Sequence, residues 1–206
     1  MNFVYFDDQD VGKPRWLVAE TPTDEAFMKT AGFASSDEAV RLFGIFEVKG
    51  RTRGAENAAL SAPTFSAQGV TTGTGVTVVS ATLQAARAGF VMGLAVPPGS
   101  GLRYIDVEGQ RALGAERLSA PDGANLRLFG LAQQQVHVAI AFDPSRPATV
   151  VVFERSALPD TKEARELLAS RPHDANQVHS GDGALVFRRV DLRTLAPTSA
   201  SGPQAP

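Results

Sequence analysis

Short apolar segments recur about every ten residues along the chain, separated by turns rich in proline, glycine and aspartate. Within them branched apolar residues alternate with small or polar ones, most clearly over residues 76–83, as in strands with one buried face. The pattern predicts a mainly β fold, an antiparallel β-sandwich with two or three short helices. The expected strands are residues 2–6, 15–19, 76–83, 90–96, 102–107, 126–129, 136–142, 149–154 and 183–192.

Three segments have helical signals instead. Thr23, Asp24 and Glu25 precede an apolar run, so a capping side chain and early acids predict a helix that ends near Gly32. The same signals predict a second helix over residues 35–43, with Gly44 as its stop, and a polar, charged stretch around residues 160–166 predicts a third.

The length of 206 residues and the 43% hydrophobic content are sufficient for a substantial buried core. We find no internal repeat and predict one β-sandwich domain over residues 1–193. Residues 194–206 hold one large apolar side chain and almost no charge, which predicts a disordered tail. Residues 170–182 are polar and predict a mobile loop.

Composition excludes several functional classes. The chain has no cysteine, which excludes disulfides, thiolate metal sites and cysteine nucleophiles. Twenty basic residues against twenty-two acidic ones argue against nucleic-acid binding through a broad basic surface. No segment approaches the ~18–20 apolar residues that span a bilayer, so we expect no direct membrane insertion, and the acidic cluster after residue 6 does not fit a signal peptide.

Two clusters suggest metal ligands. His173 and His179, with Asp174 and Asp182 nearby, lie in a polar segment without the rigid spacing of a zinc site, so we interpret it as a solvated loop. Asp7, Asp8 and Asp10 suggest calcium, but no bidentate glutamate follows at the right distance, and a charged hairpin connection is the simpler interpretation.

Motifs of nucleophilic and nucleotide chemistry are missing from the sequence. Ser100 lies in a Pro-Gly-Ser-Gly turn rather than a nucleophile elbow, and the glycines around Thr74 are followed by no phosphate-binding lysine. His137 lies between Val136 and Val138 and is therefore expected on the polar face of its strand. We predict no catalytic residue and no metal ligand, and keep an enzyme with an unrecognised site as a remote alternative.

Several short motifs, in order, resemble a known family. They are the opening Phe-Val-Tyr-Phe-Asp-Asp-Gln-Asp with the following Gly-Lys-Pro-Arg-Trp-Leu, residues 97–110, residues 126–131, the strand end Phe-Glu-Arg-Ser-Ala-Leu-Pro at 153–159, and the closing residues 171–190. Together they resemble the C-terminal soluble region of membrane-anchored M28-family zinc aminopeptidases. The sequence departs from that pattern at Ala157, where the family's glycine is missing, and over residues 47–62.

The resemblance implies a non-catalytic accessory domain of a longer polypeptide, whose upstream peptidase domain is the expected partner. Zinc is expected only in that domain, so this chain needs no cofactor, and the implied location is the extracytoplasmic, periplasmic side of a bacterial membrane. We expect Trp16, Tyr104 and Arg155 as interface anchors, since aromatic and arginine side chains dominate such contacts. The alternative is a free-standing sandwich that binds a glycan or peptide, although one tryptophan and two tyrosines supply few aromatic platforms.

Overall fold

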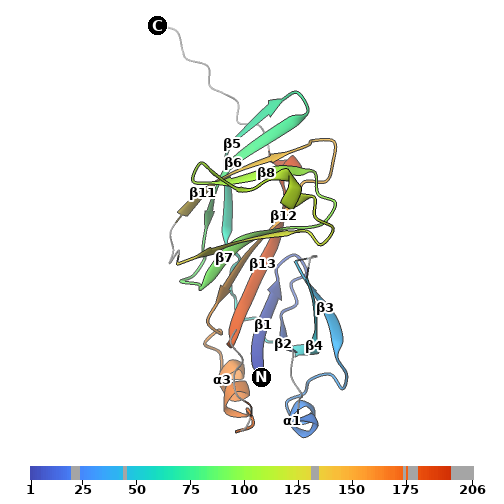
Figure 1. Ribbon diagram of the computed structural model, residues 1–206. Helices are drawn as coiled ribbons and strands as arrows, with labels where there is room; N and C mark the ends of the chain where they lie inside the picture. The colour runs from blue at the N-terminus through green and yellow to red at the C-terminus, as the bar shows by residue number, and fades with distance from the viewer. Residues whose placement is uncertain (20–23, 44–45, 131–134, 174, 176–180, 196–206) are drawn as a thin grey trace.

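The computed structural model describes residues 1–19, 24–43, 46–130, 135–173, 175 and 181–195. Within these ranges the fold is mainly β, with two sheets and three short α-helices, which confirms the predicted fold class. The molecule is elongated, with the smaller sheet at one end and helices α1 and α3 at the other (Figure 1). The predicted tail over residues 194–206 lies outside the described residues from position 196 onward, as does most of the loop predicted over residues 170–182.

The larger sheet has eight strands in the order β10-β7-β12-β13-β1-β2-β4-β3, and the smaller has five in the order β5-β6-β11-β8-β9. The larger sheet comprises β1 (Asn2–Asp8), β2 (Arg15–Ala19), β3 (Glu38–Leu42), β4 (Phe46–Gly54), β7 (Val91–Val96), β10 (Ala124–Phe129), β12 (Thr149–Ser156) and β13 (Gly183–Asp191). The smaller comprises β5 (Thr64–Gly73), β6 (Val76–Gln84), β8 (Leu102–Val107), β9 (Gln110–Leu113) and β11 (Gln135–Phe142). The helices are α1 (Glu25–Thr30), α2 (Ala115–Leu118) and α3 (Lys162–Ala169), and a 3-10 turn, η1 (Leu192–Thr194), follows β13.

Two sequence predictions need correction. The helix expected over residues 35–43 is strand β3, because Glu38–Leu42 pairs with β4 and this pairing outweighs the helical tendency of alanine and leucine. The sheet is also not purely antiparallel: β1 pairs with β13 in parallel, Val4 opposite Gly183 and Asp8 opposite Phe187. The first and last strands of the described chain thus join the two halves of the larger sheet.

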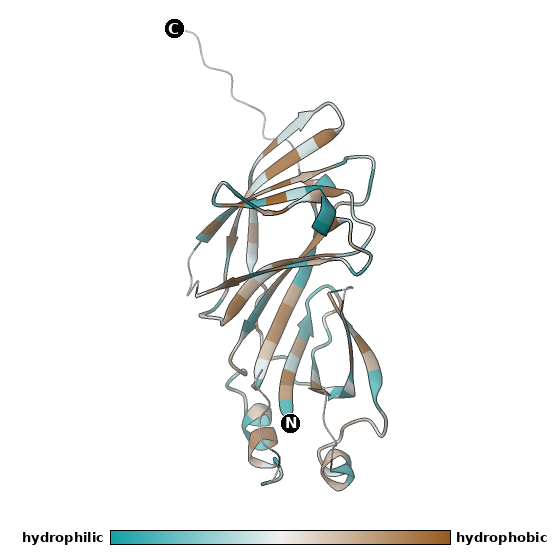
Figure 2. Ribbon diagram, viewed as in Figure 1, coloured by the Kyte–Doolittle hydropathy of each residue, from teal (hydrophilic) through white to brown (hydrophobic). Residues whose placement is uncertain are grey.

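One face of the larger sheet is covered in two places. At one end, β10, β7 and β12 pack on the smaller sheet through an apolar core that includes Leu94, Ile140 and Val152, all fully buried. At the other end, α1 and α3 cover β1 and β2, where Trp16 and Met28 are fully buried. In Figure 2 much of these strands is coloured apolar, in agreement with the continuous apolar runs of β7 and of residues 150–153 in β12. We call this the inner face.

The opposite, outer face of the larger sheet carries a smaller apolar cluster. Its buried members are Phe43, Ala95, Val151, Phe153, Leu185 and Phe187. Phe43 comes from the turn after β3, Leu42 of β3 packs against the cluster, and the other buried members come from β7, β12 and β13. The outer face therefore has its own buried apolar cluster, bordered by the β3–β4 hairpin.

Candidate functional site

The strand register brings three residues of the outer face into one row. Arg127 of β10 lies opposite Gly93 of β7, and Gly93 lies opposite Phe153 of β12. Because alternate residues of a strand share a face, the neighbouring rows bring Asn125 and Phe129 to the same side as Arg127. The sequence thus places aromatic, basic and amide side chains together around a glycine.

Gly93 makes room for the ring beside it. A Cβ atom at this position would lie 2.1 Å from the carbonyl oxygen of Leu126 and 2.7 Å from Cζ of Phe153. Any side chain here would therefore collide with both the neighbouring strand and the Phe153 ring. The absence of a side chain lets Phe153 lie close to the sheet, where it is 3% exposed.

Phe43 covers Phe153 from the turn after β3. Its backbone has φ +58°, a left-handed conformation that is uncommon outside glycine, and its side chain is 6% exposed. The ring stacks on Phe153 with centroids 4.6 Å apart and meets Phe187 edge-on at 5.2 Å. Contacts of this kind contribute about 0.5–1.5 kcal/mol beyond area burial, which helps to offset the backbone strain.

Between this turn and the sheet lies a cleft of about 370 Å³, which we call the outer cleft. It is lined by Leu42, Phe43, Glu47, Val48, Val91, Asn125, Arg127, Phe153, Arg155 and Leu185. Six of these ten side chains are apolar, and the polar ones include two guanidinium groups. The lining combines a hydrophobic interior with a few polar groups, as in ligand and peptide pockets.

Electrostatics at the outer cleft favour an anion. Arg155 donates a hydrogen bond to the carbonyl oxygen of Gly181 at 3.1 Å, while Arg127 forms no ion pair within the described part of the chain. Burial, and then the positive charge of Arg127, lower the pKa of the Arg155 guanidinium. Glu47 supplies the one carboxylate among the lining residues.

The amide of Asn125 adds an unsatisfied polar atom. Its oxygen Oδ1 is buried and accepts no hydrogen bond from the residues that the structure describes. Buried acceptors in folded proteins are nearly always satisfied, so an unpaired one in a cleft points to a donor supplied from outside.

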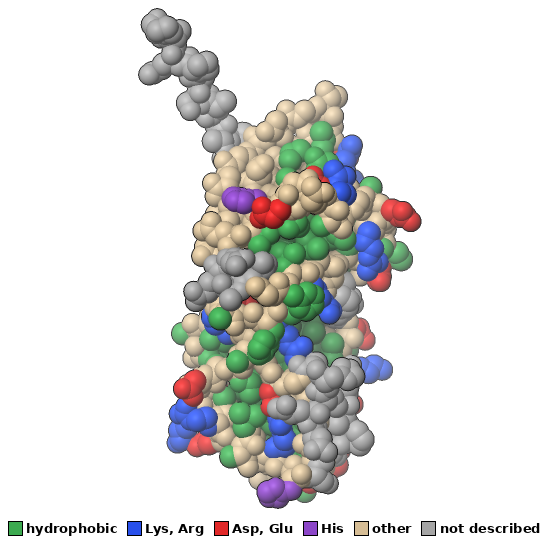
Figure 3. Space-filling view, turned by 60° about the vertical axis from the view of Figure 1, so that its left-hand side comes forward, with side chains coloured by type: hydrophobic (Ala, Val, Ile, Leu, Met, Phe, Trp, Pro, Cys, Tyr) green, Lys and Arg blue, Asp and Glu red, His purple; other side chains and the backbone are tan. Residues whose placement is uncertain are grey.

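Exposed aromatic side chains continue the apolar surface beyond the outer cleft. Phe129 is 68% exposed at the end of β10 and lies opposite Val91, a lining residue; Phe90, directly before Val91, is 58% exposed. On the face of the molecule in Figure 3, hydrophobic side chains are interspersed with basic ones across the middle of the molecule. Exposed phenylalanines next to an apolar cleft are typical of an interaction surface.

The three anchor residues expected from the sequence lie in different places. Arg155 lines the outer cleft. Trp16 is fully buried in the core beneath α1, with its ring centroid 5.4 Å from that of Tyr5. It offers no surface to a partner, so the expectation that it is an interface anchor is wrong. Tyr104 is half-buried on the smaller sheet, and the guanidinium of Arg111 covers its ring at 3.7 Å. Sequence reasoning missed Phe43 and Arg127.

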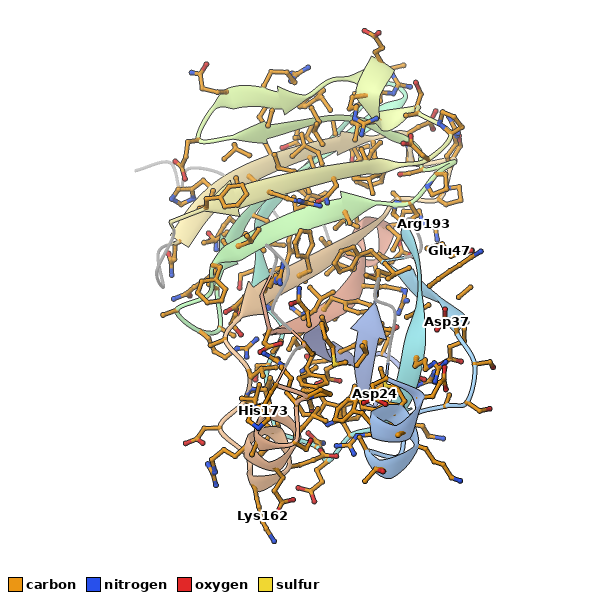
Figure 4. All side chains as sticks on the ribbon, turned by 60° about the horizontal axis from the view of Figure 1, so that its bottom comes forward. Asp24, Asp37, Glu47, Lys162, His173 and Arg193 are labelled. Atoms are coloured by element: carbon orange, nitrogen blue, oxygen red, sulfur yellow. The ribbon has the colours of Figure 1, made fainter. Side chains whose placement is uncertain are left out.

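The two suggested metal clusters differ in what the structure describes. His173 follows α3 near the end of the molecule shown in Figure 4, but His179 and Asp174 lie outside the described residues, so that pair stays untested. Asp8 and Asp10 bind the guanidinium of Arg189 at 3.0 and 2.9 Å, consistent with a charged hairpin connection. Among the described residues, no group of three or more potential ligands is placed to hold a metal ion.

His137 lies on the exposed face of β11, between the buried Val136 and Val138, as the alternation predicted. Its backbone amide donates a hydrogen bond to Glu108 at 2.7 Å. No described carboxylate or hydroxyl is bound to its ring in an arrangement for general base catalysis.

A buried acid on the inner face was also missed. Glu154 is fully buried and accepts hydrogen bonds from the backbone amides of Ala86 and Arg87 at 2.8 and 3.3 Å. Its Oε1 lies 3.7 Å from Nε of Arg87 and accepts no hydrogen bond in the described region. Burial raises the pKa of Glu154, although the Arg87 charge opposes the rise. Because Arg87 and two amides already engage this acid, we interpret it as a structural tie between β12 and residues 86–87.

A second hollow, of about 700 Å³, lies between α1 and α3 at the end of the molecule seen in Figure 4. Its lining includes the ion pair of Arg53 and Glu163, 3.1 Å apart, and apolar side chains such as Phe27 and Leu167. Glu163 also accepts a hydrogen bond from the backbone amide of Glu56 at 2.9 Å. Nε of Arg53 is buried here without an acceptor among the described residues, but the charges of Arg53 and Glu163 already neutralise each other, whereas the lining of the outer cleft has two guanidinium groups and one carboxylate.

Comparison with known proteins gives no family assignment: no family model matches the chain, and no curated protein matches it. None of the helices described is long and apolar enough to cross a membrane. The outer cleft is therefore identified from its geometry and chemistry alone.

Proposed function

We propose that the chain is a non-catalytic interaction domain of a membrane-anchored M28-type zinc aminopeptidase. Its partner would be the peptidase domain of the same polypeptide, and its location the periplasmic side of a bacterial membrane. The resemblance of the sequence motifs supports this choice of partner. One structural observation supports the interaction role: the exposed aromatic and arginine surface around the outer cleft, on strands of a packed sheet.

This surface meets the physical needs of a contact between domains. Stable interfaces bury about 1,200–2,000 Å² in total, and a few aromatic and arginine side chains near the centre carry most of the binding energy. Phe129, Phe90, Arg127 and Arg155 are side chains of this type. Strand β7 is hydrogen-bonded to β10 on one side and to β12 on the other, so the surface is already rigid before contact. Little conformational entropy is therefore lost on binding.

The proposed role leaves hydrolysis to the peptidase domain. Zinc and its general base would belong there, and no residue of this chain is assigned to either role. The domain would support the peptidase or restrict access to it, and both roles require contact at a fixed orientation.

Two experiments test the proposal. The coding sequence upstream is read first, and it should continue into transmembrane segments and a zinc peptidase domain; a start codon preceded by unrelated sequence would contradict the proposal. The purified chain is then assayed with leucine para-nitroanilide, with and without added zinc. We expect no turnover by this chain and zinc-dependent turnover by the polypeptide that also contains the peptidase domain. Zinc-dependent hydrolysis by the chain alone would refute the non-catalytic assignment.

The outer cleft also favours a second candidate, a free-standing module that binds peptide. Its apolar lining and paired guanidinium groups suit a peptide better than a glycan, since Phe43 and Phe153 pack on each other instead of offering open ring faces. The upstream coding sequence distinguishes this candidate from the first.

A further inference from the structure

The outer cleft has three features, and each restricts what can occupy it. Its walls are apolar, its rim is positively charged, and one buried acceptor lacks a donor. An occupant that satisfies all three must carry an apolar group, a negative charge and a hydrogen-bond donor.

The apolar walls set the size of the occupant. Phe43, Phe153, Val91 and Leu185 enclose much of the volume of about 370 Å³. Pockets that hold small ligands span about 300–1,000 Å³, so this cleft is at the small end and suits one aromatic side chain with its neighbouring backbone. A ring placed here would meet aromatic and aliphatic surface, the environment in which it gains most from burial.

The charges at the rim of the outer cleft determine the charge of the group that can bind there. Arg127 and Arg155 lie on strands that flank β7, near enough for the charge of Arg127 to act on Arg155, and Glu47 is the one acid that lines the cleft. A carboxylate between the two guanidinium groups would relieve their repulsion and form charge-assisted hydrogen bonds. A cation would increase that repulsion.

The buried Oδ1 of Asn125 can accept a hydrogen bond from an N–H group of the occupant. Asn125 and Arg127 are alternate residues of β10 on the outer face, so a donor at one and a carboxylate at the other lie about 6–7 Å apart along the strand. The backbone amide of a peptide, one or two residues from an acidic side chain, satisfies both positions.

The surroundings indicate a protein segment and not a free small molecule. The apolar surface continues outside the outer cleft to Phe129, which a single small ligand in the cleft would leave uncovered. β10 is also the outermost strand of the larger sheet, so its free edge adjoins the same surface. A peptide segment extends along such a surface, whereas a small carboxylate does not.

We infer that the outer cleft binds a segment of the partner protein in which an acidic residue adjoins an aromatic one. The aromatic ring enters the outer cleft beside the stacked pair of Phe43 and Phe153, against Val91 and Leu185. The carboxylate binds Arg127 and Arg155, and a backbone N–H of the segment reaches Asn125. This inference rests on the proposed interaction function and names the chemistry that the peptidase domain would present.

The test is a titration of the ¹⁵N-labelled chain followed by backbone and arginine side-chain NMR signals. The probe is N-acetyl-Asp-Phe-amide; N-acetyl-Lys-Phe-amide tests the sign of the charge, and 3-phenylpropanoate represents a free aromatic carboxylate. The variant is Arg127→Gln, whose side chain is exposed, and its matched control is Arg103→Gln, an exposed arginine of the smaller sheet.

We expect the Asp-Phe probe to shift signals of Asn125, Arg127 and Arg155, and to bind more tightly than either comparator. Loss of one charge-assisted contact should weaken binding of this probe to Arg127→Gln by about tenfold or more, with no change for Arg103→Gln. Equal binding of the Lys-Phe probe, shifts remote from the outer cleft, or unchanged affinity in Arg127→Gln would overturn the inference. Tighter binding of 3-phenylpropanoate would assign the cleft to a small molecule and overturn the peptide occupant.

The two proposals can fail separately. If the domain binds a peptidase domain but Arg127→Gln leaves that affinity unchanged, the docking chemistry is wrong and the accessory function remains. If the reading frame encodes no peptidase domain while the Asp-Phe probe still binds the outer cleft, the accessory function is wrong and the cleft belongs to a free-standing peptide-binding module.

Discussion

Gly93→Ala tests whether the floor of the outer cleft depends on a missing side chain. The added Cβ would lie 2.1 Å from the Leu126 carbonyl oxygen and 2.7 Å from the Phe153 ring, and ordinary contacts begin near 3.4 Å. The carbonyl belongs to the backbone of β10, so relief requires β7 and β10 to separate by more than 1 Å on the scale of these distances. The ring must also leave its stacked position against Phe43.

Overpacking of this kind destabilises by about 1–3 kcal/mol, and weakened strand hydrogen bonds add about 0.5–1.5 kcal/mol each. We therefore expect a loss of about 3 kcal/mol in the free energy of unfolding. With a denaturant slope of about 2–3 kcal/mol/M in urea, this moves the unfolding midpoint down by about 1–1.5 M.

The assay is urea unfolding followed by the fluorescence of Trp16, the only tryptophan and a fully buried one. The control is Gly54→Ala, also in a strand of the larger sheet, where an added Cβ meets nothing within 4 Å. This change should alter stability by less than about 1 kcal/mol. Equal unfolding midpoints for the two variants would refute the packing described for the floor of the cleft.

Three further changes test other parts of the structure. Burial raises the pKa of Glu154 above 4.5, so above that pH the folded chain holds a proton that the unfolded chain has lost, and the free energy of unfolding falls as pH rises. Glu154→Gln should remove this fall in urea unfolding measured at several pH values, whereas the exposed control Glu116→Gln should keep it. Asp24→Ala removes the side-chain cap of α1 and should lower stability by about 1 kcal/mol in thermal unfolding; no change in melting temperature would contradict the cap. Asp182→Ala breaks a half-buried ion pair with Arg171 and should lower stability by about 2–3 kcal/mol in urea, whereas a loss below 0.5 kcal/mol on the same scale would mean that the pair is absent in solution.

Much of the strand pattern was predictable because alternation is a local property. The tip at Glu108 and Gly109, both with positive φ, joins β8 to β9, and a Glu-Gly pair directly after an apolar segment favours such a turn. Strands β4 and β5 were missed: the first mixes charged residues with Gly50, and the second is rich in threonine, serine and glycine, so neither has the apolar alternation that marks a strand.

Other features depend on contacts that sequence periodicity does not contain. The parallel pairing of β1 with β13 joins segments almost 180 residues apart, and the strand identity of β3 depends on its partner β4. Tertiary pairing decides both features. Local propensity therefore predicts the wrong structure for Glu38–Leu42 and gives no information on the pairing of β1 with β13.

The outer cleft was predictable only in part. Arg155 was expected as an interface anchor and lines the cleft. Alternation over residues 124–129 would have placed Asn125, Arg127 and Phe129 on one face, which is the signal that could have found them. The position of Phe43 follows from the turn after β3 and from the space left by Gly93, neither of which is visible in a strand pattern.

Amide hydrogen exchange of this chain, alone and joined to the peptidase domain, tests most directly whether the outer cleft is the contact surface that we propose. Exchange is compared over β10 and residues 90–93, which border the outer cleft, and over the β5–β6 hairpin, which does not. We expect slower exchange around the cleft in the joined polypeptide and unchanged exchange in the hairpin. Unchanged exchange around the cleft, with protection elsewhere, would contradict the proposal.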